Sequence, residues 1–172
     1  INRLENLVRN KYPEKTARPE NKNVQSDPQN DFERLNIASL FWEDGKTAPG
    51  NDKIKLCAAY VKAKNKSVED PIQYDDAIEI TVDFEKQYES ENLVISMRLL
   101  DQLESPVFIA STAGAENSVH AHNCKDKNRY VATATIPSRL LNYGMFTVGF
   151  NFADGEDKIA AKFPKLLSFY IT

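Results

Sequence analysis

Cysteine is scarce in this sequence, with two residues among 172. Cys57 falls within a predicted strand and Cys124 within a predicted loop, far apart along the chain. Sparse and distant cysteines are typical of reduced thiols in a cytosolic protein, and a single disulfide between the two is the alternative. We therefore expect two reduced thiols.

Histidine is equally scarce, and both residues lie in one polar loop predicted from Thr112 to Asn128. His120 and His122 stand close to Cys124, which could suggest a metal cluster. Zinc sites of the usual kinds need further ligands at set spacings, and the sequence offers no third histidine. We therefore expect a solvated loop here, with neither a metal site nor a cofactor.

Clustered positive charge and long apolar runs are also missing. The formal net charge is −3, and the 22 lysine and arginine residues are scattered along the chain. Nucleic-acid binding needs a concentrated positive field, so this composition argues against it. No apolar run approaches the roughly 18 residues that a membrane-spanning helix needs. The charged N-terminal sequence INRLENLVRNKY does not resemble a signal peptide.

Catalytic motifs are missing as well. The tripeptide Gly45-Lys46-Thr47 resembles the end of a phosphate-binding P-loop, but Leu40 stands where that motif needs its first glycine. Pro49 also excludes the helix that must follow, and no nucleophile elbow is present. The 25 aspartate and glutamate residues leave hydrolysis by paired carboxylates open. Acidic side chains on the outer face of a strand are by default a solvated surface.

Short segments in which apolar and polar residues alternate, separated by turn signals, make up most of the chain after residue 32. This pattern predicts β-strands, and several strands without a long helix predict an all-β, immunoglobulin-like antiparallel β-sandwich. One helical turn is predicted over Ser138–Tyr143, ended by Gly144, and a loop over Asp154–Lys158. The predicted strands are Lys53–Lys62, Ala77–Lys86, Leu93–Leu100, Pro106–Ser111, Tyr130–Ile136, Met145–Phe152 and Leu166–Ile171.

The first 31 residues have a different composition. Ile1–Tyr12 carries apolar residues at helical spacing and is too short to be stable alone. Pro13–Asp31 contains three prolines among polar residues, which is typical of a linker. We therefore predict a short helix and linker from a preceding domain over residues 1–31, and the β-sandwich domain over residues 32–172.

The strand Met145–Phe152 places four large apolar side chains on one face and Thr147, Gly149 and Asn151 on the other. A glycine within a strand often marks a close approach of a ligand or another backbone. If the strands Leu93–Leu100, Met145–Phe152 and Leu166–Ile171 are neighbours, their outward residues meet on one face. These residues are Ser96, Arg98, Thr147, Gly149, Asn151, Ser168 and Tyr170.

Such a face would have a shallow floor of small residues, Gly149 among them, with Arg98, Asn151 and Tyr170 as its walls. Sugars suit this chemistry, because their hydroxyl groups pair with planar donors and acceptors and their C–H faces stack on aromatic rings. The alternative is an ordinary sheet face that is solvated or buried in a dimer. The face is therefore a candidate carbohydrate-binding site.

Several short pieces between Trp42 and Thr172 resemble one known family in their order and spacing. The pieces are Trp42, Ala48-Pro49-Gly50-Asn51-Asp52, Ile54-Lys55-Leu56, Ile78-Glu79-Ile80, Val107-Phe108, Ala134-Thr135-Ile136-Pro137, Leu140-Leu141-Asn142-Tyr143-Gly144 and Leu167-Ser168-Phe169. With these pieces the sequence resembles the C-terminal domain of the ATP-binding subunit of O-antigen polysaccharide ABC exporters, the Wzt type.

The resemblance implies a non-catalytic β-sandwich that forms a homodimer and binds a polysaccharide. In that family the domain follows the ATPase domain, at the cytoplasmic side of the inner membrane, together with the transmembrane subunits. It recognises the finished, often capped, non-reducing end of the lipid-linked O-antigen and thereby licenses export. The resemblance supplies no sugar-contacting motif, so the candidate residues depend on the argument from the strand faces.

Other functions stay open from the sequence. The same sandwich could be a structural dimerisation domain without a glycan ligand, or a carbohydrate-active enzyme. It could also be a recognition module attached to a glycosyltransferase or a methyltransferase.

Overall fold

The computed structural model describes residues 37–42, 47–89, 92–113, 128–155 and 158–172. The predicted helix and linker, the two histidines and Cys124 lie outside these residues. None of the described residues is helical, so these residues form no helix that is long and apolar enough to cross a membrane. The strands are β1 (Ser39–Phe41), β2 (Ile54–Ala63), β3 (Ile78–Lys86), β4 (Leu93–Leu100), β5 (Pro106–Ser111), β6 (Arg129–Ile136), β7 (Gly144–Asp154) and β8 (Lys158–Ile171).

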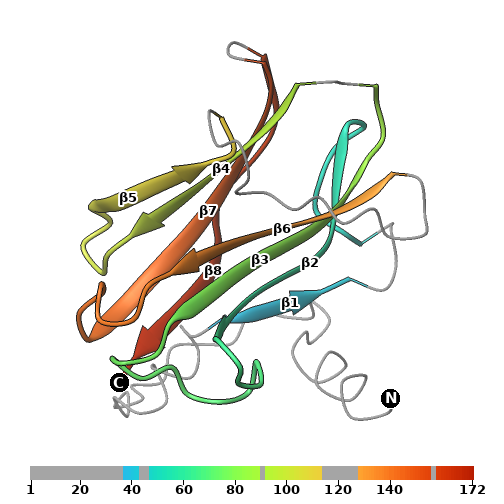
Figure 1. The fold of residues 1–172 in the computed structure, drawn as a ribbon. Coiled ribbons are helices and arrows are strands. Elements are labelled where there is room, and N and C mark those ends of the chain that lie inside the picture. Colours follow the sequence, from blue (N-terminus) through green and yellow to red (C-terminus); the bar gives the residue numbers. More distant parts are fainter. Residues whose placement is uncertain (1–36, 43–46, 90–91, 114–127, 156–157) are drawn as a thin grey trace, which may run out of the picture. The chain divides into compact units, whose positions relative to one another are not determined.

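The strands form two four-stranded sheets, with the orders β1-β2-β3-β6 and β5-β4-β7-β8 (Figure 1). Every pair of neighbouring strands is antiparallel. The predicted all-β antiparallel sandwich is therefore confirmed, and each of the predicted strands is present. Cys57 lies in β2, as predicted.

The core lies between the two sheets and is built from the alternate residues of each strand. In β7 the four predicted inward residues are all buried: Phe146, Val148, Phe150 and Phe152. The ring of Phe152 meets that of Phe84 from the other sheet edge-to-face, with centroids 4.8 Å apart. Burying one such side chain contributes about 1.5–3 kcal/mol, so these alternating positions hold the layers together.

Two strands depart from the prediction. β1 is only three residues long, too short to show an alternating pattern. β8 begins at Lys158 instead of Leu166, and its register against β7 shifts twice. A shift places two successive residues on the same face, and Ala160 and Ala161 are indeed both buried. Because the bulges break the alternation of inward and outward residues, the first half of β8 does not show the pattern of a strand.

The helical turn predicted over Ser138–Tyr143 is wrong. Arg139 has a φ of 63°, in the left-handed region, and its N–H donates to the carbonyl oxygen of Tyr74 at 3.2 Å. This bond joins two segments that are distant in sequence, instead of closing a turn within one segment. The segment therefore turns without forming a helix, and its conformation depends on a partner that only the fold supplies.

The register brings several connections to one end of the sandwich. Ala63, Ile78 and Ile136 are paired in adjacent strands, as are Gly144 and Ile171 in the other sheet. Residues 64–77, residues 137–143 and Thr172 extend directly from these positions.

Candidate functional site

The residues predicted to form a carbohydrate-binding face lie on three neighbouring strands. The sheet order β4-β7-β8 is the one required, and strand alternation places the predicted residues outward. Ser96 pairs with Asn151 and Arg98 pairs with Gly149. We call this set the outer strip, and its members are Ser96, Arg98, Thr147, Gly149, Asn151, Ser168 and Tyr170.

The expectation that Gly149 forms an open floor is wrong. Gly149 is buried, and a Cβ atom built on it would lie 2.3 Å from the carbonyl oxygen of Pro164. Pro164 belongs to the bulge of β8, whose register shifts between Val148 and Phe150. Of the two explanations for a glycine in a strand, close approach of another backbone is the one that applies here. The chain itself covers this position.

The outer strip is also longer than a cup for one sugar. Tyr170 pairs with Met145, six residues along β7 from Asn151, which corresponds to about 20 Å at the rise of a β-strand. Tyr170 and Asn151 therefore cannot be walls of one small floor. Thr147 and Arg98 lie between these ends.

Several strip residues contact their own chain. The Oγ of Ser96 donates to the Oγ of Ser111 at 3.1 Å. The Oγ of Ser168 accepts from the N–H of Ile37 at 3.1 Å, and its own N–H donates to the carbonyl of Ile37 at 3.0 Å. By contrast, Arg98 is exposed and has no hydrogen bond or ion pair to another described residue. Arg98 is therefore the strip's available cationic donor.

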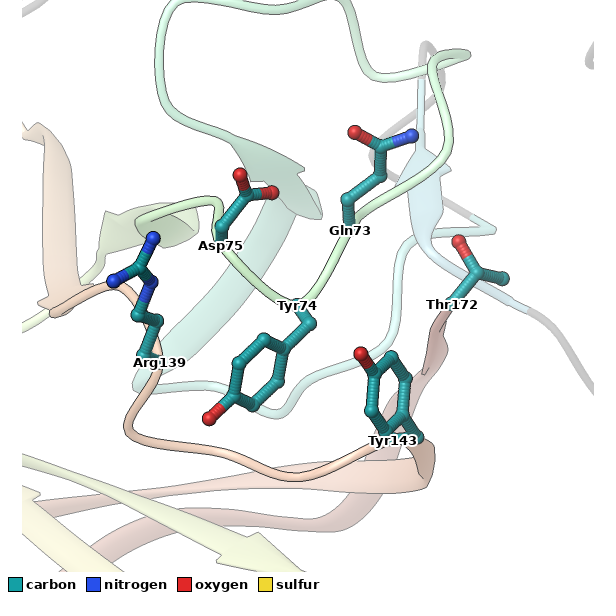
Figure 2. A pocket seen from close by; sticks show the side chains of 6 residues that line it. All are labelled: Gln73, Tyr74, Asp75, Arg139, Tyr143 and Thr172. Carbon is teal, nitrogen blue, oxygen red and sulfur yellow. The ribbon is translucent and has the colours of Figure 1, made fainter.

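The structure also contains a pocket at the end of the sandwich where the connections meet (Figure 2). Its volume is about 540 Å³, within the range of small-molecule sites. Sequence reasoning did not find this pocket. Its described lining residues, which we call the end pocket, are Gln73, Tyr74, Asp75, Arg139, Tyr143 and Thr172.

The backbone of Tyr74 joins the three segments of the end pocket. Its N–H donates to the carbonyl of Thr172 at 3.0 Å, and its carbonyl accepts from the N–H of Arg139 at 3.2 Å. The N–H of Thr172 in turn donates to the carbonyl of Ile72 at 3.0 Å. Backbone groups that are paired in this way hold the lining segments in fixed positions.

Asp76 fixes the segment that carries three of the lining residues. Its Oδ2 accepts from Lys66 Nζ at 2.7 Å and from the N–H of Gln73 at 2.8 Å. Burial on its own would raise the pKa of Asp76, but the hydrogen bonds from Lys66 and Gln73 and the charge of Lys66 outweigh it. The pKa therefore lies below its ordinary value of 3.8.

The side chains of the end pocket combine an aromatic surface with planar polar groups. The rings of Tyr74 and Tyr143 stack with centroids 5.0 Å apart, and Tyr143 is 66% exposed, so its outer face is open. Arg139 and Asp75 contribute a guanidinium and a carboxylate to the lining (Figure 2). The side chains of Gln73, Asp75 and Arg139 have no hydrogen bond or ion pair to other described residues. Their donors and acceptors are available to a ligand.

Two signals in the sequence could have pointed to this pocket. Tyr74 and Tyr143 are aromatic residues in predicted connections, where no strand pattern explains them. The sequence does not show that the two connections share one end of the sandwich, because that depends on strand register. No group of three or more His, Cys, Asp or Glu residues within the described ranges could hold a metal ion.

Comparison with known proteins shows the fold. The sandwich is similar to the C-terminal domain of wzt. The two structures align with a TM-score of 0.59 over 72% of this chain and 76% of the other, at 11% sequence identity. At that identity the likeness concerns the fold alone.

A second solved structure, a Niemann-Pick type C2 protein from Japanese carpenter ant, aligns with a TM-score of 0.48. The alignment covers 73% of this chain and 97% of the other at 12% identity. No family model matches the sequence, and no curated protein matches it. The resemblance noted in the sequence therefore has a structural counterpart in the fold of the wzt domain.

Proposed function

We propose that this chain is a non-catalytic glycan-recognition module. It binds the non-reducing, capped end of a lipid-linked O-antigen polysaccharide and licenses export of that polysaccharide by an ABC transporter. The observation that carries the proposal is the likeness of its fold to the C-terminal domain of wzt, together with the resemblance of the short sequence pieces from Trp42 onward. The proposed setting is the cytoplasmic side of the inner membrane, in a homodimeric ATPase subunit beside the transmembrane subunits.

The outer strip supplies the proposed contacts. The residues assigned to the glycan are Ser96, Arg98, Thr147, Asn151 and Tyr170. Gly149 belongs to the same face, where its missing side chain leaves room for the backbone of the β8 bulge. A strip of about 20 Å suits an extended chain of sugars better than a single ring.

Binding without hydrolysis agrees with the polar groups present. Glycoside hydrolysis generally uses two carboxyl groups on either side of the scissile bond. The described part of the outer strip contains no carboxylate, and Asp75 is the single carboxylate among the described lining residues of the end pocket. Neither surface offers the required pair among these residues.

A screen of bacterial polysaccharides, followed by calorimetric titration with capped and uncapped forms, tests the proposal. We expect binding to one capped polysaccharide and none to its uncapped form. Arg98→Ala and Tyr170→Ala should weaken this binding while light scattering shows an unchanged association state. Absence of binding to every glycan contradicts the proposal.

The second candidate function is a structural dimerisation domain with no ligand. The two hydrogen bonds between Ile37 and Ser168, one of them to the Ser168 hydroxyl, favour considering it, because they show that part of the strip already contacts another segment of its own chain. If Tyr170→Ala abolishes the dimer and no glycan binds, this alternative holds. Determining the sequence upstream of Ile1 would test the transporter setting, since an ATPase domain is expected there.

A further inference from the structure

The end pocket and the outer strip lie next to each other. Thr172 lines the pocket and directly follows β8, two residues after Tyr170. Figure 2 shows the side chains of Gln73 and Thr172 pointing to the same side. Tyr143 is likewise two residues before Met145, the partner of Tyr170. The Tyr170 end of the strip therefore lies at the same end of the sandwich as the pocket.

We propose that the end pocket binds a neutral pyranose ring, the terminal sugar of the glycan whose following units lie along the outer strip. The aromatic pair of Tyr74 and Tyr143 offers the surface for the C–H face of the ring, and polar side chains of the lining pair with its hydroxyl groups. This assignment rests on the proposed glycan function and adds a separate subsite to it.

The charges of the lining favour a neutral ligand. The described lining contains one cation, Arg139, and one anion, Asp75. An anionic group would be attracted by one and repelled by the other, so the pair gives little net preference for charge. Both groups are strong hydrogen-bonding partners for hydroxyls, because a guanidinium only donates and a carboxylate only accepts.

The preformed geometry favours a fixed subsite. Tyr74 holds the three lining segments by backbone hydrogen bonds, and its ring supports Tyr143 from behind. A ligand therefore meets a ring whose position is already restricted, which reduces the entropy lost on binding. The neighbouring Leu140 is 61% exposed in the same connection but does not line the pocket. It provides a matched control position.

The test is an NMR titration of the full 172-residue chain, labelled with ¹⁵N. The probes are the methyl pyranosides of glucose, galactose, mannose and N-acetylglucosamine, with methyl glucuronide as the anionic arm. We expect at least one neutral probe to shift the amide signals of Gln73–Asp75, Arg139, Tyr143 and Thr172. Tyr143→Ala should weaken its binding about 3- to 10-fold, the range expected for loss of one aromatic contact. Tyr143→Phe and Leu140→Ala should leave it nearly unchanged.

The outcomes separate this subsite from the function on which it rests. If Tyr170→Ala weakens the polysaccharide identified in the screen but leaves the neutral monosaccharide unaffected, both proposals stand. If the polysaccharide binds and neither Tyr143→Ala nor Arg139→Ala changes its affinity, the end pocket is wrong while glycan recognition survives. Shifts produced by the glucuronide alone also overturn the neutral-ring assignment. If no polysaccharide and no pyranoside binds, both proposals fall.

Discussion

The Cα of Gly149 in β7 lies directly beneath the backbone of Pro164 in β8, so closely that a Cβ atom would be 2.3 Å from the Pro164 carbonyl oxygen. This approach exists because β8 bulges between the residues that pair with Val148 and Phe150. The glycine at the centre of the predicted sugar-binding strand is thus required by the fold, and its substitution should affect stability.

Gly149→Ala should lower the free energy of unfolding by about 1–3 kcal/mol, the usual range for overpacking a site that cannot easily relax. Urea denaturation measures the change. Thr147→Ala, two residues away on the same face, is the control and should have a smaller effect. The double variant Gly149→Ala with Pro164→Ala should not recover, because the obstructing atoms belong to the backbone. An unchanged denaturation midpoint for Gly149→Ala would contradict the close approach.

Asn51 joins the start of β2 to β8 with three side-chain hydrogen bonds. Its Nδ2 donates to the carbonyl of Ala160 at 2.7 Å, and its Oδ1 accepts from the N–H groups of Lys53 and Ile54, both at 2.9 Å. Asn51→Ala should cost about 1–3 kcal/mol, because it removes the partner of the Ala160 carbonyl and of the Ile54 N–H, whose bonds are partly buried.

Asn51→Asp keeps both acceptor bonds but loses the donor to Ala160, and at neutral pH it places a carboxylate against that carbonyl. Its deficit relative to the natural chain should shrink in acid, where the protonated carboxyl can donate the missing bond. Denaturation of both chains across the acid range measures this. A deficit that does not change with pH would count against the Ala160 contact.

Asp76 makes the stability of the end-pocket segment dependent on pH. Because its pKa in the folded chain is below 3.8, its ionised form stabilises the fold at pH values above 3.8. That contribution is lost as the pH falls through the lowered pKa. The stability difference between the natural chain and Asp76→Asn should therefore be largest near neutral pH and shrink below about pH 3.8. Asp75→Asn is the matched control, because it removes a neighbouring negative charge. A stability loss of Asp76→Asn that grows as the pH falls would contradict the stabilising role of ionised Asp76.

Arg129 and Asp83 form a bidentate pair between β6 and β3. Nε donates to Oδ1 at 2.9 Å, and an Nη donates to Oδ2 at 2.7 Å. Arg129→Lys cannot reproduce the two parallel bonds, so we expect a loss of about 0.5–1 kcal/mol for this partly exposed pair. A double-mutant cycle with Asp83→Asn, repeated at high salt, measures the coupling. A coupling energy of zero at low salt would show that the pair does not contribute.

Much of the fold could be predicted because alternation is a local signal. In β3 and β7 each apolar residue that the pattern placed inward is buried. The sequence left the adjacency of β4, β7 and β8 as a condition, and the sheet order meets it. The first half of β8 could not be predicted, because its bulges break the alternation of apolar and polar residues. The turn at Arg139 could not be predicted either, since its hydrogen-bond partner, Tyr74, is 65 residues away in sequence.

The sequence by itself determined the class of fold and which residues face outward on β4, β7 and β8, because side-chain direction alternates along any strand. It also supplied the resemblance to the wzt domain. Only the tertiary structure decided what those outward residues meet. The bulge of β8 covers Gly149, and strand register separates Asn151 from Tyr170 along the sheet. Register also gathers Tyr74, Arg139, Tyr143 and Thr172 into one pocket. These contacts join residues distant in the chain, so no local pattern encodes them.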